Sequence, residues 1–261
     1  MKKLLLIATG GTIASETGEE GLKPGLGAQA LLAHVPRLES LYSVDAVQPL
    51  SLDSTNMRPE NWVCIAECIR EHYDAYDGFV ISHGTDTMAY TAAALSYLVM
   101  HSPKPIILTG AQRSIVTEDT DARTNLYDAF CYASDAASHG VSIVFDGHVI
   151  TGTRARKVRT KSRNAFESVD YPPVALVRDG RVLRYIREDR PNEPTFYREM
   201  DPRVAVVKLT PGLPWQAVNA LRGCVDALVV ESFGVGGLPS SDGGALLKEI
   251  RGWREAGKVV A

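Results

Sequence analysis

The sequence has 261 residues, of which 45% are hydrophobic and 23% charged, a balance typical of a folded globular protein. The formal net charge is −3 with both signs interspersed, which argues against nucleic acid as the main partner. No apolar run reaches the length of a membrane-spanning helix, so we expect no membrane partner. The length suits one large domain or two smaller ones.

The four cysteines, at positions 64, 68, 131 and 224, predict neither a disulfide framework nor a metal site. Cys64 and Cys68 lie one helical turn apart, but no second pair or nearby histidine completes a ligand set. We therefore expect buried free thiols, no metal and no cofactor. Reduced thiols fit the cytoplasm, and the apolar run at residues 4–7 is too short for a signal peptide.

The first aliphatic run, residues 4–7, predicts a buried parallel strand. Thr9 and Thr12 follow it, with Gly10 and Gly11 between them. Glycines allow a sharp turn and a close approach to a ligand, and open α/β sheets bind ligands beyond the carboxyl ends of their strands. Thr12 is therefore a candidate nucleophile, although a tight turn with capping hydroxyls explains this segment equally well.

A second strand with a polar carboxyl end is expected at residues 79–81. His-Gly-Thr-Asp-Thr follows at residues 83–87, and residues 88–100 predict a helix. Two strands therefore end in Gly-Thr loops, each with a hydroxyl that could react. This pair is far more specific than either motif alone.

The segments between these motifs predict connections and a third polar strand end. Residues 16–27 are rich in glycine and predict a mobile connection, either a plain solvent loop or a lid over Thr12. A helix is expected at 28–35 and a strand at 44–50. Asp53 and Ser54 follow that strand as turn formers or as binding residues, and Pro59 then opens another helix.

The remainder of the chain alternates strands and helices, which predicts a mainly parallel sheet flanked by helices in a larger N-terminal α/β domain. An Asp-Gly pair at 179–180 predicts a hairpin, and the proline-containing stretch 187–203 reads as a linker. We therefore expect an N-terminal domain over residues 1–186 and a smaller α/β C-terminal domain over residues 204–261.

The two Gly-Thr motifs resemble the bacterial L-asparaginases, a family with a threonine nucleophile, and the cytoplasmic type I branch most of all. The residues that carry the likeness are Thr-Gly-Gly-Thr-Ile-Ala-Ser at 9–15 and His-Gly-Thr-Asp-Thr-Met-Ala-Tyr-Thr at 83–91. The likeness runs over nearly the whole chain. It implies hydrolysis of L-asparagine to L-aspartate and ammonia through a threonine acyl-enzyme, with weaker activity on L-glutamine.

The resemblance also implies roles for individual residues. Thr12 attacks the side-chain amide, while Thr85, Asp86 and Lys157 form a hydrogen-bonded triad, although the sequence alone does not separate the two threonines. Asp86 also holds the substrate's α-ammonium, and Asp53 and Ser54 lie at the substrate, with Ser54 on its α-carboxylate. The family lysine precedes a segment like the one here at residues 165–171, and the count back from Phe166 gives Lys157.

Some positions depart from the family pattern or leave a choice open. Lys161 is the nearest rival to Lys157 within a basic run at residues 151–171, and a solvated charge run explains the remaining basic residues. Leu22 stands about where many members have a lid tyrosine. Members of the family associate as dimers or tetramers and continue for several more elements, so we expect self-association and a chain that stops inside its second domain.

Three other functions compete with this interpretation. The amidase subunit of a tRNA-dependent amidotransferase shares these motifs but carries an extra N-terminal domain, whereas here the Gly-Gly loop begins within ten residues of the start. An amino-acid-binding module without catalysis would differ by releasing no ammonia. Phosphate or nucleotide binding by Gly10 and Gly11 is disfavoured, since neither the Gly-x-Gly-x-x-Gly nor the Gly-Lys-Ser/Thr fingerprint is present.

Overall fold

The computed structural model describes residues 1–18 and 21–261, without the side chains of residues 16–24. The chain divides into two compact units, Met1–Glu199 and Met200–Ala261. Within the described part of the chain, no helix has the length and apolar character needed to cross a membrane.

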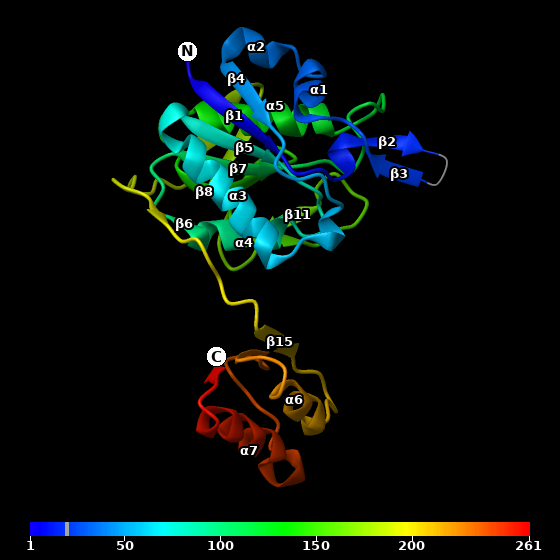
Figure 1. Ribbon diagram of the computed structural model, residues 1–261, viewed down its shortest axis with the longest axis vertical. Helices are drawn as coiled ribbons and strands as arrows, with labels where there is room; N and C mark the ends of the chain where they lie inside the picture. Colours follow the sequence, from blue (N-terminus) through cyan, green and yellow to red (C-terminus); the bar gives the residue numbers. More distant parts are fainter. Residues whose placement is uncertain (19–20) are drawn as a thin grey trace. The chain divides into compact units, whose positions relative to one another are not determined.

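The first unit is built on an eight-stranded sheet with the order β13-β12-β9-β8-β7-β5-β1-β4, and Figure 1 labels its five strands from β8 to β4. Its centre consists of five parallel strands, namely β4 (Ser43–Val47), β1 (Lys3–Ala8), β5 (Gly78–Ser82), β7 (Pro105–Thr109) and β8 (Gly140–Phe145). β1, β5, β7 and β8 are aliphatic because strands of a parallel sheet are covered on both faces. The predicted fold, a mainly parallel sheet flanked by helices, is confirmed.

An antiparallel extension continues this sheet beyond β8. It consists of β9 (His148–Thr151), β12 (Ala175–Arg178) and β13 (Arg181–Arg184). The turn between β12 and β13 is the predicted Asp-Gly hairpin, in which Asp179 and Gly180 both have positive φ. The sequence analysis did not predict β9.

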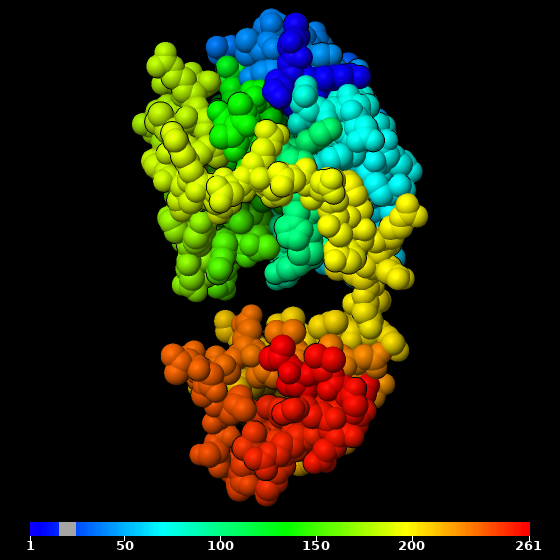
Figure 2. Space-filling model, turned by 90° about the vertical axis from the view of Figure 1, so that its left-hand side faces the viewer, coloured from blue at the N-terminus to red at the C-terminus, as the bar shows by residue number. Residues whose placement is uncertain are grey.

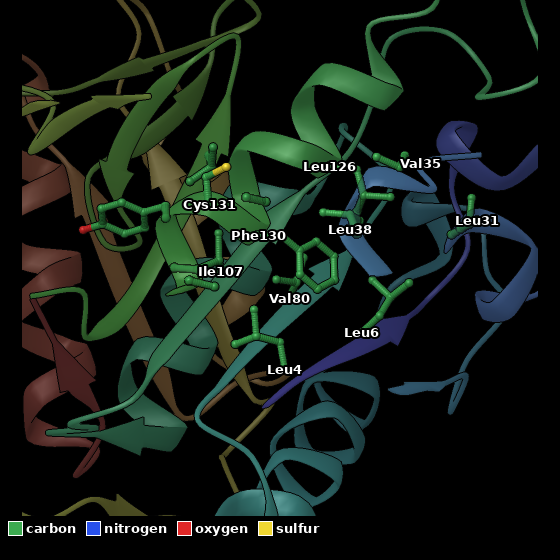
Figure 3. Packing of buried hydrophobic residues seen from close by; sticks show 14 of the residues in the cluster. Leu4, Leu6, Leu31, Val35, Leu38, Val80, Ile107, Leu126, Phe130 and Cys131 are labelled. Carbon is green, nitrogen blue, oxygen red and sulfur yellow. The ribbon is translucent and has the colours of Figure 1, made fainter. Parts of the chain in front are cut away.

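Helices cover the parallel strands. α1 (Ala28–Ala33), α2 (Arg37–Leu41) and α5 (Ala122–Ser134) share one core with the sheet, and Figure 3 shows Leu4, Val80 and Ile107 of the strands beside Phe130 of α5. α3 (Pro59–His72) and α4 (Met88–Leu98) pack together, and α4 lies on β7 and β8. Pro59 opens α3 as expected, because a first-turn residue needs no amide hydrogen bond.

Part of the glycine-rich stretch 16–27 is more regular than a plain loop. β2 (Ser15–Gly18) and β3 (Gly21–Pro24) form an antiparallel hairpin here. The lid hypothesis and the place of Leu22 depend on side chains 16–24 and on residues 19–20, which lie outside the described part of the chain.

The segment expected as a linker, residues 187–203, begins on the surface of the first unit. β14 (Thr195–Phe196) pairs with β6 (Val99–Met100), so the helix predicted to reach residue 100 ends at Leu98. Arg190 Nε donates a 2.7 Å hydrogen bond to the Pro103 carbonyl. Figure 2 shows this segment in yellow across the surface. Arg198 Nε lies 3.7 Å from Glu67 of α3 and so still contacts the first unit. We propose that residues 200–203 form the connection between the units.

The second unit contains three parallel strands and two helices around its own core. The elements are β15 (Val204–Lys208), β16 (Ala227–Glu231), β17 (Val259–Val260), α6 (Trp215–Leu221) and α7 (Ser241–Glu255). The fully buried Trp253 packs with Leu228 and Val218 in this core. β17 lies at the end of the chain, and its Val259 is 65% exposed.

The cysteines only partly follow the expectation of buried free thiols. All four are free, but Cys64 is half-buried and Cys224 exposed, while Cys68 and Cys131 are buried. Burial raises the pKa of the Cys68 thiol to about 11. This thiol therefore stays protonated and unreactive at neutral pH.

Candidate active site

A small cavity opens where the loops after β1, β4 and β5 meet. These are neighbouring parallel strands, and β1 lies between the other two, so the chain leaves β1 first to one side and later to the other. Such a reversal leaves a crevice at the carboxyl ends of the strands. The cavity measures about 130 Å³ and is lined by Gly11, Thr12, Ser15, Asp53, Ser54, Gly84, Thr85 and Asp86. All the predicted site residues except Lys157 therefore line one cavity.

Two glycines allow the three loops to pack backbone against backbone. Gly11 has a φ of +84°, and a Cβ added to it would lie 2.4 Å from the Gly84 Cα. A Cβ on Gly84 would lie 2.6 Å from the Ser54 Oγ. No side chain fits at such distances, so these two glycines set how closely Thr12, Ser54 and Thr85 approach one another.

Lys157 reaches the rim of the cavity from β10 (Ala155–Lys157). Its Nζ donates hydrogen bonds of 2.8 Å to Thr85 Oγ1 and 2.6 Å to Asp86 Oδ1. The Lys157 side chain is only 12% exposed, whereas that of Asp86 is 55% exposed. The three residues predicted as a triad thus form a continuous chain of hydrogen bonds, and the open side of the Asp86 carboxylate remains accessible to solvent.

The position of Lys157 follows from the pairing of two short strands. β10 is antiparallel to β11 (Phe166–Ser168), and Lys157 lies directly opposite Phe166. Phe166 is buried and packs against Phe145 at the end of β8, which fixes this hairpin against the sheet. Lys161 is exposed and makes no hydrogen bond or ion pair with any described residue.

Asp53 and Ser54 differ in how firmly they are held. Asp53 Oδ1 accepts hydrogen bonds of 2.9 Å from the Thr55 N–H and 2.8 Å from Thr55 Oγ1, so it caps the short helix Ser54–Asn56 while lining the cavity. Ser54 is only 3% exposed. Its carbonyl accepts a 2.7 Å hydrogen bond from Thr87 Oγ1, which ties the loop after β4 to the loop after β5.

Two polar residues at this site, Ser15 and His83, were not predicted from the sequence. Ser15 lines the cavity, and its Oγ donates a 3.0 Å hydrogen bond to the Gly11 carbonyl. His83 is fully buried behind the cavity, and burial lowers the pKa of its imidazole to about 4. Both lie within the two motifs, but their contacts depend on how the loops fold back, for which the sequence carries no periodic signal.

The comparisons with known proteins agree with this geometry. The family model "Asparaginase, N-terminal" matches residues 3–190. The L-asparaginase of Thermococcus kodakarensis is 40% identical over 239 residues, which is 91% of this chain and 73% of that protein. L-asparaginase 1 of Escherichia coli K12 is 37% identical over 272 residues, which is 99% of this chain and 78% of that protein.

Solved structures give the same result. The thermostable L-asparaginase of T. kodakarensis superimposes with a TM-score of 0.92 at 38% identity, covering 99% of this chain and 78% of that one. The probable cytoplasmic L-asparaginase of Campylobacter jejuni has a TM-score of 0.87 at 26% identity, with coverage of 100% and 82%. By its family model, its relatives and its fold, this chain belongs to the asparaginase family.

Proposed function

We propose that this protein is an L-asparaginase that hydrolyses the side-chain amide of L-asparagine to L-aspartate and ammonia. The observation that carries the proposal is the hydrogen-bonded chain from Lys157 to Thr85 and Asp86, beside a cavity that Thr12 also lines. Amide hydrolysis by a hydroxyl nucleophile needs such a group to move its proton. The relatives named L-asparaginase support the choice of substrate.

In the proposed mechanism, Thr12 Oγ attacks the side-chain amide carbon of asparagine. The carbon–nitrogen bond breaks, an ester forms on Thr12, and the hydroxyl proton leaves on ammonia. Thr85, Lys157 and Asp86 relay this proton through their hydrogen bonds. Water then hydrolyses the ester and regenerates the hydroxyl. The support for Thr12 as nucleophile is its place on the cavity and the likeness of its motif to the family.

The proposed substrate contacts follow from charge and burial. Asp86 pairs with the α-ammonium, because its exposed carboxylate faces the cavity rim. Ser54 holds the α-carboxylate from the buried floor, and Asp53 lies beside it. The cavity of about 130 Å³ suits a small amino acid. Glutamine adds one methylene, and a pocket discriminates against it by about 1–3 kcal/mol. We therefore expect weaker glutamine turnover.

Ammonia release from asparagine, glutamine and buffer tests the proposal directly. Turnover of asparagine with a higher kcat/KM than glutamine is the expected result. Binding of aspartate without ammonia release would instead support an amino-acid-binding module. Equal kcat/KM values for the two amides would identify a mixed amidase rather than an asparaginase.

We further propose a cytoplasmic type I enzyme. The C. jejuni relative is described as a probable cytoplasmic L-asparaginase. The four free thiols agree with a reducing compartment. Fractionation of the native host, with immunodetection in the cytoplasmic and membrane fractions, tests this location.

Self-association as a dimer or tetramer belongs to the same proposal. Its support is α4, which starts at Met88 beside the site and contains no charged residue. Tyr90 and Tyr97 on this helix are 67% and 62% exposed. Exposed aromatic side chains on an uncharged face are typical of interfaces between subunits. Light scattering tests this, and a double Tyr90→Glu, Tyr97→Glu variant should have a lower mass. A monomeric wild type would contradict it.

A further inference from the structure

The two glycines that precede the candidate threonines share an unusual feature. The Gly11 carbonyl, which belongs to the peptide unit before Thr12, accepts a 3.0 Å hydrogen bond from Ser15 Oγ. The Gly84 carbonyl, which belongs to the peptide unit before Thr85, is 2.7 Å from His83 Nδ1. Each candidate threonine therefore follows a carbonyl that a nearby side chain contacts, although the Gly11 carbonyl also accepts a 3.1 Å hydrogen bond from the Ala14 N–H.

The surroundings of His83 define which of its nitrogens carries the proton. A carbonyl oxygen only accepts, so Nδ1 must donate to Gly84, and Nε2 is then an acceptor. Thr91 Oγ1 lies 2.9 Å from Nε2 and donates to it, while Trp62 Nε1 donates a 2.9 Å hydrogen bond to the Thr91 oxygen. Each donor in this series of hydrogen bonds, from Trp62 through Thr91 to His83, has one acceptor. The network links α3 and α4 to the loop after β5.

Glycine gives these side-chain contacts a specific consequence. A glycine has no Cβ to restrict its backbone, so the peptide unit that follows it rotates more freely than after other residues. A planar peptide unit has a fixed relation between its carbonyl and the next amide. Holding the Gly11 and Gly84 carbonyls therefore sets the direction in which the Thr12 and Thr85 backbones continue, and with it the place of each hydroxyl.

We propose that Ser15 and His83 are positioning residues that fix the peptide units before Thr12 and Thr85. This inference rests on the proposed asparaginase function for its kinetic consequence, but its structural content is independent. His83 does not exchange protons with substrate, because it lies fully buried behind the loop. Ser15 is itself held in place, because its carbonyl accepts a hydrogen bond from Ser114 Oγ of the loop after β7.

The kinetic test compares matched variants. Ser15→Ala removes the side-chain hydrogen bond to the Gly11 carbonyl and leaves the one from the Ala14 N–H. Ser40→Ala removes a similar serine-to-carbonyl bond at an exposed position of α2 and should leave the rate unchanged. His83→Leu removes the anchor of Gly84. In His83→Asn the amide N–H₂ takes the place of Nδ1 and keeps the donor. The exposed His148→Asn is its control.

Displacement of a reacting group by about 1 Å lowers a rate by about 10²-fold. We expect kcat to fall about 10-fold in Ser15→Ala and His83→Leu, with smaller changes in KM, and His83→Asn to recover much of the loss.

Crystal structures of the same variants separate this inference from the function. A turned peptide unit at Gly84–Thr85 in His83→Leu, restored in His83→Asn, supports the inference even if the wild type releases no ammonia, in which case only the proposed function fails. A turned unit at Gly11–Thr12 in Ser15→Ala supports it equally. Unchanged peptide orientations with kcat values like those of the controls would overturn it. The inference would also be overturned if the variants melted at a lower temperature but kept the wild-type kcat at 25 °C. Ser15 and His83 would then be merely structural.

Discussion

Lys157 and Thr85 are 72 positions apart in the sequence, and their side chains meet through a 2.8 Å hydrogen bond at the carboxyl end of the sheet. β10, which carries Lys157, is a short strand outside the main sheet, whereas Thr85 follows a central strand. The contact therefore depends on the β10–β11 hairpin being seated correctly. It brings a nearly buried ammonium to a hydroxyl and a carboxylate at the same time.

The first prediction concerns this ammonium. Lys157→Met keeps much of the side-chain length and removes the charge, so it should lower kcat by about 10²–10⁴-fold, the usual range for a group that transfers a proton. Steady-state ammonia release measures the effect. Lys161→Met is the matched control, because Lys161 is exposed and makes no polar contact within the described residues. The reverse ranking would assign the triad lysine to position 161.

Much of this arrangement could be predicted from the sequence because it depends on strand ends. The aliphatic runs before Thr12 and Thr85 marked parallel strands, and the carboxyl ends of such strands share one edge of the sheet. The prediction of Lys157 needed the family resemblance. β10 and β11 are only three residues long, and β10 contains two charged residues, so periodicity gives no strand signal there.

Other features could not be predicted from the sequence, for physical reasons. The β2–β3 hairpin lies in a glycine-rich stretch, where turn residues obscure any alternation of apolar and polar side chains. Ser15 and His83 hold carbonyls through contacts that exist only once the loops have folded back.

The second prediction concerns the nucleophile. Thr12→Ala should reduce turnover by at least about 10⁴-fold, because removal of the nucleophile lowers kcat by at least this factor in hydrolases that form an acyl-enzyme. Aspartate binding, measured by calorimetry, should survive because Asp86 and Ser54 remain. Thr85→Ala should also lower kcat, so the rate alone does not separate the two threonines.

Trapping of the ester makes that separation. Wild-type protein mixed with asparagine, quenched in acid and digested should carry the added acyl mass on the peptide that contains Thr12. Acyl mass on the Thr85 peptide would exchange the roles of the two residues. A Thr12→Ala protein that retained more than a tenth of the wild-type rate would also exclude Thr12 as the nucleophile.

The third prediction concerns the floor of the cavity. Ser54→Ala removes a hydroxyl that we propose to donate to the α-carboxylate, and a hydrogen bond to a charged group contributes about 1.5–3 kcal/mol. We expect KM for asparagine to rise at least about 10-fold, with a smaller change in kcat. Ser40→Ala on exposed α2 is the control. A fall in kcat with an unchanged KM would move Ser54 from substrate binding to the reaction itself.

The last prediction concerns stability rather than catalysis, and it rests on Asp128 of α5. This residue is only 6% exposed, and its pKa is raised to about 7, first by burial and then by the negative charges of Asp146 and Asp179. An ordinary aspartate in the unfolded chain has a pKa near 3.9. The folded protein therefore binds a proton that the unfolded chain has lost between about pH 4 and pH 7.

The sign of the effect follows from this difference. The stabilising contribution of the raised pKa is complete below about pH 4 and is lost as the pH rises through about 7. Asp128→Asn is uncharged at every pH, so its melting temperature relative to wild type should increase between pH 5 and pH 8. The free energy of unfolding of the wild type falls by about 1.4 kcal/mol for each pH unit between pH 5 and the pKa of about 7. The melting temperature of Asp128→Asn relative to wild type should therefore rise by about 5 °C across this range.

Calorimetry of both proteins at several pH values measures this difference, with Asp74→Asn at an exposed position as the matched control. Effects of other titrating groups cancel in the comparison, because the two proteins share them. The fully buried His83, whose pKa is lowered to about 4, contributes to the pH dependence of both proteins and cancels in the same way. A melting-temperature difference that stayed constant from pH 5 to pH 8 would mean that Asp128 remains charged in the folded protein, and that solvent or a cation reaches it between the turns that carry Asp146 and Asp179.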